Sequence, residues 1–361
     1  MIKNTLRRVD KGSLFVFFAI IFIGLINIYS ASIADNTHKF FTRQMIWIAI
    51  GIVIGFIIFK VNYSIWEKYS YPIYFFALIL LVVVYIFSPT IKGAHRWLVL
   101  GPISLQPSEF AKFTTIMALA YYLSNKKQSL DFKSIIIPLL IITIPFLMIL
   151  IQPDLGTAGT LMLIGVGMLL VFGLRLRFFI FSLITGFAGI FVLYDFILKD
   201  YQRRRLTTFL NPEKDPLGAG YHIIQSKIAI GSGGFWGKGF LKGTQTQLSF
   251  LPEQHTDFVF SVFAEEWGAI GVSLILFLYL ILFLWGISVA KNSKDQFGKF
   301  LATGIVLHLF IHFIINLAMI TGAFPVVGIP LPFLSYGGSS LLVLFLEMGL
   351  LFNIQANRFM F

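Results

Sequence analysis

Long apolar runs separated by short polar segments recur along almost the whole chain. These runs are about 20 residues long, which a helix needs to cross a bilayer, whereas a membrane-barrel strand needs only about ten. Because lipid offers no hydrogen-bond partners, the backbone of such a run must satisfy its polar groups internally, as it does in a helix. The pattern therefore predicts an all-α fold, a polytopic membrane helix bundle.

The apolar runs predict about ten transmembrane helices. Their approximate bounds are 14–32, 44–60, 70–88, 107–124, 134–151, 157–173, 177–197, 257–289, 299–322 and 335–356. The first run is too long for the apolar region of a signal peptide, and no small-residue cleavage site follows it. We therefore interpret it as a retained span.

The distribution of Lys and Arg predicts the orientation of the bundle. An even number of spans puts both termini on one side of the membrane. The loops on that side carry most of the basic residues, among them Lys60, Lys126, Lys291 and Lys294, whereas the short opposite loops carry fewer. Cytoplasmic loops are enriched in Lys and Arg, so we expect the N- and C-termini to be cytoplasmic.

Composition narrows the class of protein. Of the 361 residues 57% are hydrophobic and 12% are charged, against about 25% charged in a typical soluble domain. The formal net charge of +12 fits basic cytoplasmic loops and an anionic substrate, so we predict no nucleic-acid partner. The absence of cysteine excludes disulfides, thiolate metal sites and cysteine nucleophiles. Residues 1–361 are expected to form a single integral membrane domain.

Most of the remaining polar sequence falls in the predicted outer loops, at residues 88–108, 152–157, 199–256 and 322–335. The loop of about 199–256 is far longer than ordinary connections, and loops of that length are usually functional. We therefore expect a functional site at the outer mouth of the bundle.

The segment GAHRWLVLGPISLQPSEFAK, Gly93 to Lys112, leads into the fourth span. Pro107 is tolerated at a helix start, and Ser108 is a candidate cap. Glu109 and Lys112 are three residues apart and share a helix face, as a structural ion pair or as a pair that faces a polar cavity.

Three further motifs contain charged side chains with two interpretations each. Arg96 beside Trp97 is a substrate-binding guanidinium or a membrane-interface anchor. Asp154, in QPDLGT, is a helix cap or a carboxylate that faces the outer cavity. The run Arg203 to Arg205 binds lipid headgroups or, more specifically, a diphosphate. Lys227 precedes a glycine-rich segment that matches no nucleotide-binding motif.

The segment FLPEQHTDF, Phe250 to Phe258, contains Glu253, His255 and Asp257 at the start of the eighth span. Their spacing matches no zinc-hydrolase pattern. Asp257 is either a helix N-cap or a general base in a partly desolvated mouth, although a helix N-terminus and nearby Arg lower the pKa of a carboxylate. GIPLPFLSYGGSS, Gly328 to Ser340, predicts a non-helical approach to the last span, which is tolerated where it lines a cavity or is buried in protein.

Seven of these segments occur in order between Gly93 and Ser340, and together they resemble the SEDS family (shape, elongation, division and sporulation). They are GAHRWL, LQPSEFAK, QPDLGT, RRRLTTFLNPEKDPLGAGYH, QSKIAIGSGG, FLPEQHTDFVF and PLPFLSYGGSS. This family comprises polytopic peptidoglycan glycosyltransferases. The stretch GKGFLKGTQTQLSFLPEQHTDF is most similar to the elongation member RodA.

The resemblance implies a multi-pass protein of the cytoplasmic membrane with ten spans, cytoplasmic termini and one large extracellular loop. It implies polymerisation of lipid II into β-1,4 glycan strands during cell elongation and shape maintenance, by an inverting transfer with Asp257 as the catalytic base. Together with the motifs, it gives as candidate substrate-binding residues Arg96, Trp97, Glu109, Lys112, Asp154, Arg205, Lys227, Glu253, His255, Thr256 and Ser335.

The resemblance also bears on partners and cofactors. The expected partners are lipid II (an undecaprenyl diphosphate-linked disaccharide peptide), a class B penicillin-binding protein and membrane lipids. A divalent cation, Mg²⁺ or Mn²⁺, held by carboxylates is a candidate cofactor, with no metal ligands assigned.

Three other functions are alternatives. A flippase for a lipid-linked precursor needs charge along the bundle interior and commonly has broken helices at mid-membrane, whereas the sequence concentrates charge at one mouth. A scaffold that holds a single-span transpeptidase does not account for the outer polar cluster. A division-specific FtsW-type polymerase has the same chemistry.

Overall fold

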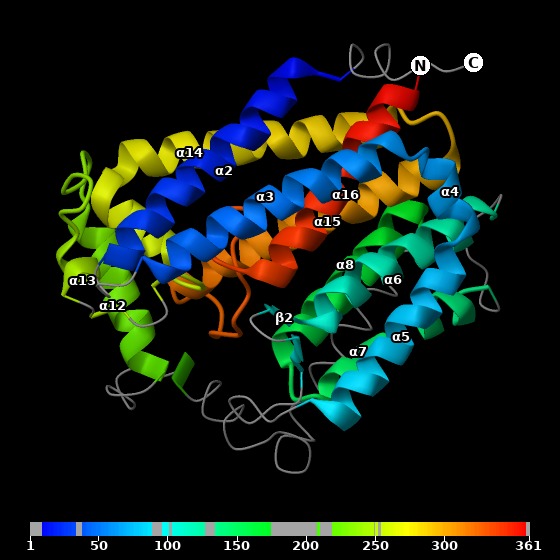
Figure 1. The fold of residues 1–361 in the computed structure, drawn as a ribbon, viewed down its shortest axis with the longest axis horizontal. Coiled ribbons are helices and arrows are strands. Elements are labelled where there is room, and N and C mark those ends of the chain that lie inside the picture. Colours follow the sequence, from blue (N-terminus) through cyan, green and yellow to red (C-terminus); the bar gives the residue numbers. More distant parts are fainter. Residues whose placement is uncertain are drawn as a thin grey trace.

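The part of the chain that the structure describes is a bundle of helices with one small β-hairpin (Figure 1). The computed structural model describes residues 9–33, 38–88, 96–100, 103–126, 134–174, 208–209, 219–248, 250–251 and 254–358. The helices are α2 Lys11–Ile33, α3 Lys39–Lys60, α4 Tyr63–Lys68, α5 Ser70–Phe87, α6 Pro107–Ser124, α7 Ile136–Ile151, α8 Leu155–Phe172, α12 Ala219–Ser232, α13 Thr244–Gln247, α14 Val259–Lys291, α15 Gln296–Ile320 and α16 Gly338–Asn357. The strands are β1 Leu98–Leu100 and β2 Ile103–Leu105.

The predicted helical membrane bundle is confirmed. Nine described helices match predicted spans, while the predicted span 177–197 lies outside the described residues. Seven of the described helices are long and apolar enough to cross a membrane. Of the other two, α7 is shorter, at 16 residues, and α6 carries the polar residues of the fourth span. The count of ten spans stays a prediction.

The two ends of the described chain meet at one end of the bundle. The backbone N–H of Asp10, just before α2, donates to Oε1 of Gln355 near the end of α16 at 3.3 Å. The β-hairpin, α12 and α13 lie toward the opposite end (Figure 1). With the predicted cytoplasmic termini, these elements lie at the outer end, where the sequence predicts the functional loops.

Helix α15 lies between several others, packing against α6, α8, α14 and α16. A Cβ added at Gly304 would lie 2.3 Å from Cγ2 of Ile116 on α6 and 2.8 Å from Sδ of Met168 on α8. Small residues allow membrane helices to approach this closely, and close packing holds such helices together. The side chains that α15 directs toward α6 are consequently deeply buried.

The long helix α14 is interrupted at Gly268, whose φ of 61° and ψ of −164° are not helical. This backbone region is essentially restricted to glycine. The outer loop docks onto the break, because the N–H groups of Ala269 and Ile270 donate to the carbonyls of Gly234 (2.9 Å) and Phe235 (3.3 Å). The loop thus satisfies backbone groups that the interrupted helix leaves unpaired.

Two buried carboxylates fix the same loop to the outer half of α14. Oε1 of Glu265 accepts from Nζ of Lys238 at 2.6 Å and from the N–H of Gln245 at 3.0 Å. Oε1 of Glu266 accepts from the N–H of Leu241 at 3.2 Å. The outer half of α14 directly follows Asp257, so this loop also supports the chain around Asp257.

Three local elements were not predicted. The sequence predicts loops at residues 88–108 and 199–256, yet these segments contain the β-hairpin, α12 and α13. The hairpin pairs Leu98 with Leu105 and Val99 with Ser104. These elements are short, and so they produce little periodicity in a sequence pattern.

Candidate active site

Asp257 lies at the outer end of α14, beside the last outer loop. The N-cap of α14 is Phe258, without a side-chain capping bond, and Asp257 is the residue before it. A Cβ added at Gly328 would lie 3.5 Å from Oδ2 of Asp257, which places the half-buried carboxylate against that loop. Nδ2 of Asn316 on α15 donates to the carbonyls of Asp257 (3.0 Å) and Ile329 (2.8 Å). Asn316 thereby fixes the backbones of the aspartate and of the loop together.

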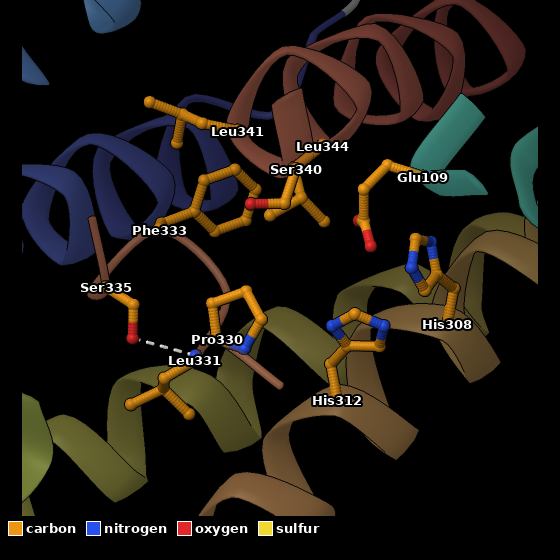
Figure 2. Close-up of a pocket in the computed structure, with 10 residues that line it drawn as sticks. All are labelled: Glu109, His308, His312, Pro330, Leu331, Phe333, Ser335, Ser340, Leu341 and Leu344. Atoms are coloured by element: carbon orange, nitrogen blue, oxygen red, sulfur yellow. Dashed lines mark hydrogen bonds between the residues drawn. The ribbon is translucent and has the colours of Figure 1, made fainter. Parts of the chain in front are cut away.

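The predicted non-helical approach to the last span is confirmed. No helix or strand occurs between the end of α15 at Ile320 and the start of α16 at Gly338. Within this segment, Oγ of Ser335 accepts from the N–H of Leu331 at 2.8 Å (Figure 2). The carbonyl of Ser335 accepts from Nε2 of Gln44 at 3.3 Å. The buried Ser335 therefore closes a turn of the loop.

Glu109 and Lys112 form an ion pair in the bundle interior, with Nζ of Lys112 at 2.8 Å from Oε1 of Glu109. The lysine side chain is 1% exposed and the glutamate side chain 7%. Nζ of Lys112 also lies 2.8 Å from Nε2 of His312. One expectation was wrong: the N-cap of α6 is Gln106, with Pro107 in the first turn and no side-chain capping bond, so Ser108 does not cap the helix.

A small cavity joins the ion pair to the last outer loop. Its lining includes Glu109, His308, His312, Pro330 and Ser335, and Figure 2 shows the glutamate and the two histidines directed toward one another. The space open to the centre of a water-sized sphere is about 10 Å³, which is room for about one water molecule. Glu109 therefore faces a cavity while it is paired, so both predicted interpretations of the pair hold in part.

The interior of the bundle also contains titratable residues that the sequence analysis did not assign. Nδ1 of His308 lies 2.7 Å from Oε1 of Glu347, and the rings of His308 and His312 are 4.5 Å apart between their centres. The sequence predicts charge concentrated at one mouth, and these buried residues add titratable groups in the bundle interior. An ionisable residue within a membrane span is by default a functional candidate. The i, i+4 spacing of His308 and His312 within a predicted span could therefore have indicated these residues from the sequence.

Asp154 caps α8, as one of the two interpretations predicted. Its Oδ1 accepts from the N–H of Thr157 at 3.3 Å and its Oδ2 from Oγ1 of the same residue at 2.9 Å. Oδ2 also accepts from Nε2 of Gln106 at 2.9 Å and lies 3.5 Å from Nη1 of Arg96. The structure thus brings Arg96 and Asp154 together, with the half-buried Trp97 next to Arg96 in the chain.

The Arg96–Asp154 pair approaches the last outer loop from the side of α8. A Cβ added at Gly156 would lie 2.6 Å from the carbonyl oxygen of Val327. Val327 precedes Gly328, which borders the carboxylate of Asp257. The last outer loop therefore lies between the start of α8 and the start of α14, and connects two groups of predicted site residues.

The remaining predicted residues lie around the long outer loop. Lys227 is exposed on α12, with its Nζ 2.7 Å from a Cβ added at Gly322. The ring of His255 stacks on Phe40 at 3.7 Å between ring centres, and its carbonyl accepts from the N–H of Tyr336 at 2.9 Å. Thr256 is half-buried beside Asp257. Arg205 and Glu253 lie outside the described residues.

The described part of the chain does not form a ready metal site, since no group of three or more His, Cys, Asp or Glu side chains within it could hold a metal ion. The carboxylates of Glu109 and Asp154 are engaged in the contacts given above. A divalent cation therefore remains a proposal.

Comparison with known proteins decides the family. Residues 11–359 match the family model FTSW_RODA_SPOVE, described as "Cell cycle protein". The chain belongs to the FtsW/RodA/SpoVE family. This confirms the resemblance inferred from the motifs, and the protein is a multi-pass protein of the cell membrane.

Relatives of this FtsW/RodA/SpoVE protein match it over nearly their full lengths. It is 42% identical over 351 residues to the peptidoglycan glycosyltransferase MrdB of Escherichia coli (strain K12), covering 97% of this chain and 94% of that protein. A chain of a solved peptidoglycan synthase complex is 32% identical, with a TM-score of 0.83, covering 98% of this chain and 99% of that one. The rod shape determining protein RodA of Thermus thermophilus is 27% identical, with a TM-score of 0.75 and 98% coverage of both chains.

Proposed function

We propose that the protein is a peptidoglycan glycosyltransferase that polymerises lipid II into β-1,4 glycan strands during cell elongation. The observation that carries this proposal is the 42% identity to MrdB over nearly both full lengths. The geometry supports it, because Asp257 lies at the outer end of the bundle against a non-helical loop that is buried only from Ile329 onward. A lipid-linked substrate can reach such a site with its sugars while its polyprenyl tail stays in the bilayer.

The chemistry requires one displacement at the anomeric carbon. Lipid II carries an α-linked diphosphate and the product bond is β, so direct attack by the acceptor hydroxyl gives the required inversion. The new bond forms between the acceptor oxygen and the anomeric carbon, the bond to the diphosphate oxygen breaks, and Asp257 takes the hydroxyl proton. A positioned general base typically contributes about 10² to 10⁴ in rate.

The leaving diphosphate needs positive charge around it. Arg96, with a 27% exposed side chain, and the exposed Lys227 are the described cations best able to meet it. Preorganised charge of this kind stabilises the charge that develops in a transition state. Arg205 and Glu253 also belong to the proposed substrate-binding residues. Lys112 supports the site indirectly, because it pairs with Glu109, which lines the cavity under the last outer loop.

A divalent cation is proposed to bind only together with the substrate. Mg²⁺ usually keeps several waters and binds one or two carboxylates together with substrate phosphates. Such binding does not require the three-ligand protein site that the described residues lack. The chemistry it would supply is neutralisation of the diphosphate, and no step above depends on it.

A class B penicillin-binding protein is the proposed partner. A similar solved chain belongs to a peptidoglycan synthase complex that coordinates polymerization and crosslinking. Because a transpeptidase cross-links the strands that a glycosyltransferase makes, coupling the two enzymes is chemically reasonable.

A flippase is the second candidate, since the buried titratable residues and the break in α14 are features of transporters. Two assays on one preparation separate the candidates. In detergent, protein plus partner and lipid II should yield glycan polymer that a muramidase degrades. In vesicles, a flippase would move lipid II between leaflets, and lipid II movement without any polymer would overturn the proposed function.

A further inference from the structure

Five titratable side chains form a continuous row through the bundle interior, defined here as the buried row: Glu109, Lys112, His312, His308 and Glu347. Each is at most 6% exposed. Three elements supply them, α6, α15 and α16, and the neighbouring members are in direct contact. The proposed transfer assigns no part to the two histidines, although burying such groups in a membrane protein is costly.

The contacts of His312 define which of its nitrogens holds the proton. The ammonium of Lys112 has donors and no acceptor, so Nε2 of His312, at 2.8 Å, must accept its hydrogen bond. A ring nitrogen that accepts carries no proton, so the ring is neutral, with its single proton on Nδ1. Pro330, in the last outer loop, lines the same cavity as His312.

His312 forms a bridge between α6 and the cavity under the last outer loop. Its Nε2 holds Lys112, which in turn pairs with Glu109, and the residue lines the cavity together with Pro330. One turn further along α15, Asn316 donates to the carbonyls of Asp257 and Ile329. The same helix face thus holds the ion pair through His312 and fixes the loop and Asp257 through Asn316.

We propose that His312 is a positioning residue for glycosyl transfer, which holds the Glu109–Lys112 pair and packs beneath the last outer loop that borders Asp257. This inference rests on the proposed function, because it takes Asp257 as the base. His312 acts through its hydrogen bond with Lys112 and through the packing of the cavity that it shares with Pro330. His308 and Glu347 complete the row, since Nδ1 of His308 contacts Oε1 of Glu347 at 2.7 Å.

Two substitutions separate positioning from simple packing. His312→Leu fills the space but removes the acceptor of the Lys112 hydrogen bond. His312→Gln supplies an amide oxygen in its place. His38→Leu, at an exposed histidine outside the buried row, is the matched control. Melting temperature, kcat and KM for lipid II are measured on each purified protein with its partner.

We expect His312→Leu to lower kcat at least about tenfold, because small displacements of a catalytic group are costly. KM should change by less than about threefold, as for a contact that matters mainly in the transition state. His312→Gln should restore most of kcat, and His38→Leu should match the wild type. A wild-type kcat in His312→Leu, or equal loss of kcat and melting temperature in both His312 variants, would overturn the proposal.

A second measurement does not depend on activity. In protein labelled with ¹⁵N-histidine, nitrogen chemical shifts distinguish the two neutral tautomers from the imidazolium, and His312→Gln identifies the signal among the six histidines. We expect the neutral Nδ1–H tautomer at pH 7. An imidazolium or an Nε2–H tautomer would contradict the bridge. If the wild type fails to polymerise lipid II, the proposed function fails, while this spectrum still tests the bridge.

Discussion

Replacing Glu109 by Gln should destabilise the folded protein by about 3 kcal/mol, because it leaves the ammonium of Lys112 buried without its counter-charge. Removing one partner of a buried ion pair costs about 3–5 kcal/mol. The low end applies here, since the Gln oxygen and Nε2 of His312, 2.8 Å from Nζ of Lys112, still accept hydrogen bonds. At about 2.1 cal/mol/K of unfolding entropy per residue, 361 residues convert this loss to a fall of about 4 °C in melting temperature.

The matched control is Glu67→Gln on α4, at a half-buried carboxylate near the cytoplasmic end. Burial, and then the charge of Asp295, raise the pKa of Glu67. A raised pKa means that the folded protein binds this proton more tightly than the unfolded chain, so the ionised carboxylate costs stability at neutral pH. Glu67→Gln should therefore not lower the melting temperature at pH 7.

The assay measures melting temperature and lipid II polymerisation on the same detergent-purified sample. If Glu109 only supports the structure, activity per folded molecule stays at the wild-type level. If its cavity face also supports the site, activity per folded molecule falls as well. An unchanged melting temperature in Glu109→Gln would refute the buried, charge-dependent pair.

Three further predictions concern the outer end of the bundle. Gly268→Ala should lower the free energy of unfolding by at least about 2 kcal/mol, because its backbone region is restricted to glycine and the added Cβ would lie 2.3 Å from the nitrogen of Gly237. The control is Gly159→Ala on α8, whose added Cβ meets nothing within 4 Å. Equal melting temperatures in the two variants would contradict the docking of the loop onto α14. Lys238→Met should cost about 1.5–3 kcal/mol, since a hydrogen bond to a charged group is lost. The exposed Lys242→Met should be neutral, and similar thermal shifts in the two variants would contradict the contact of Lys238 with Glu265. Lys227→Ala should reduce lipid II use more than Lys294→Ala, and equal reductions would argue against the outer diphosphate site.

The helices could be predicted because a membrane span requires a long apolar run, and each predicted span contains one. Even α6, with Glu109 and Lys112 in its first turns, was recognised from its run of residues. The β-hairpin and α12 were not, since short elements depend on local contacts. The docking of the glycine-rich loop onto α14 depends on the backbone conformation of Gly268, which one letter in a sequence does not reveal.

The sequence predicted which residues belong to the candidate site, but not which of them contact one another. The sequence indicated that Asp154 caps a helix and that Glu109 pairs with Lys112, because both contacts are local. The partner of Lys112 on the other side, His312, lies 200 residues away in the chain. Only the packing of α15 against α6 brings these two residues together, so the buried row could be suspected from ionisable residues within spans but not assembled.

The most direct test of the central claim is polymerisation of lipid II by Asp257→Asn, purified with its partner and compared with wild type at equal folded concentration. The substitution keeps the shape of the side chain and its place beside Gly328, and removes the basic oxygen. Melting temperature should stay near that of the wild type. Polymerisation should fall at least about 10²-fold, the low end of a general-base contribution. Wild-type turnover by Asp257→Asn would mean that this carboxylate is structural and that the base lies elsewhere.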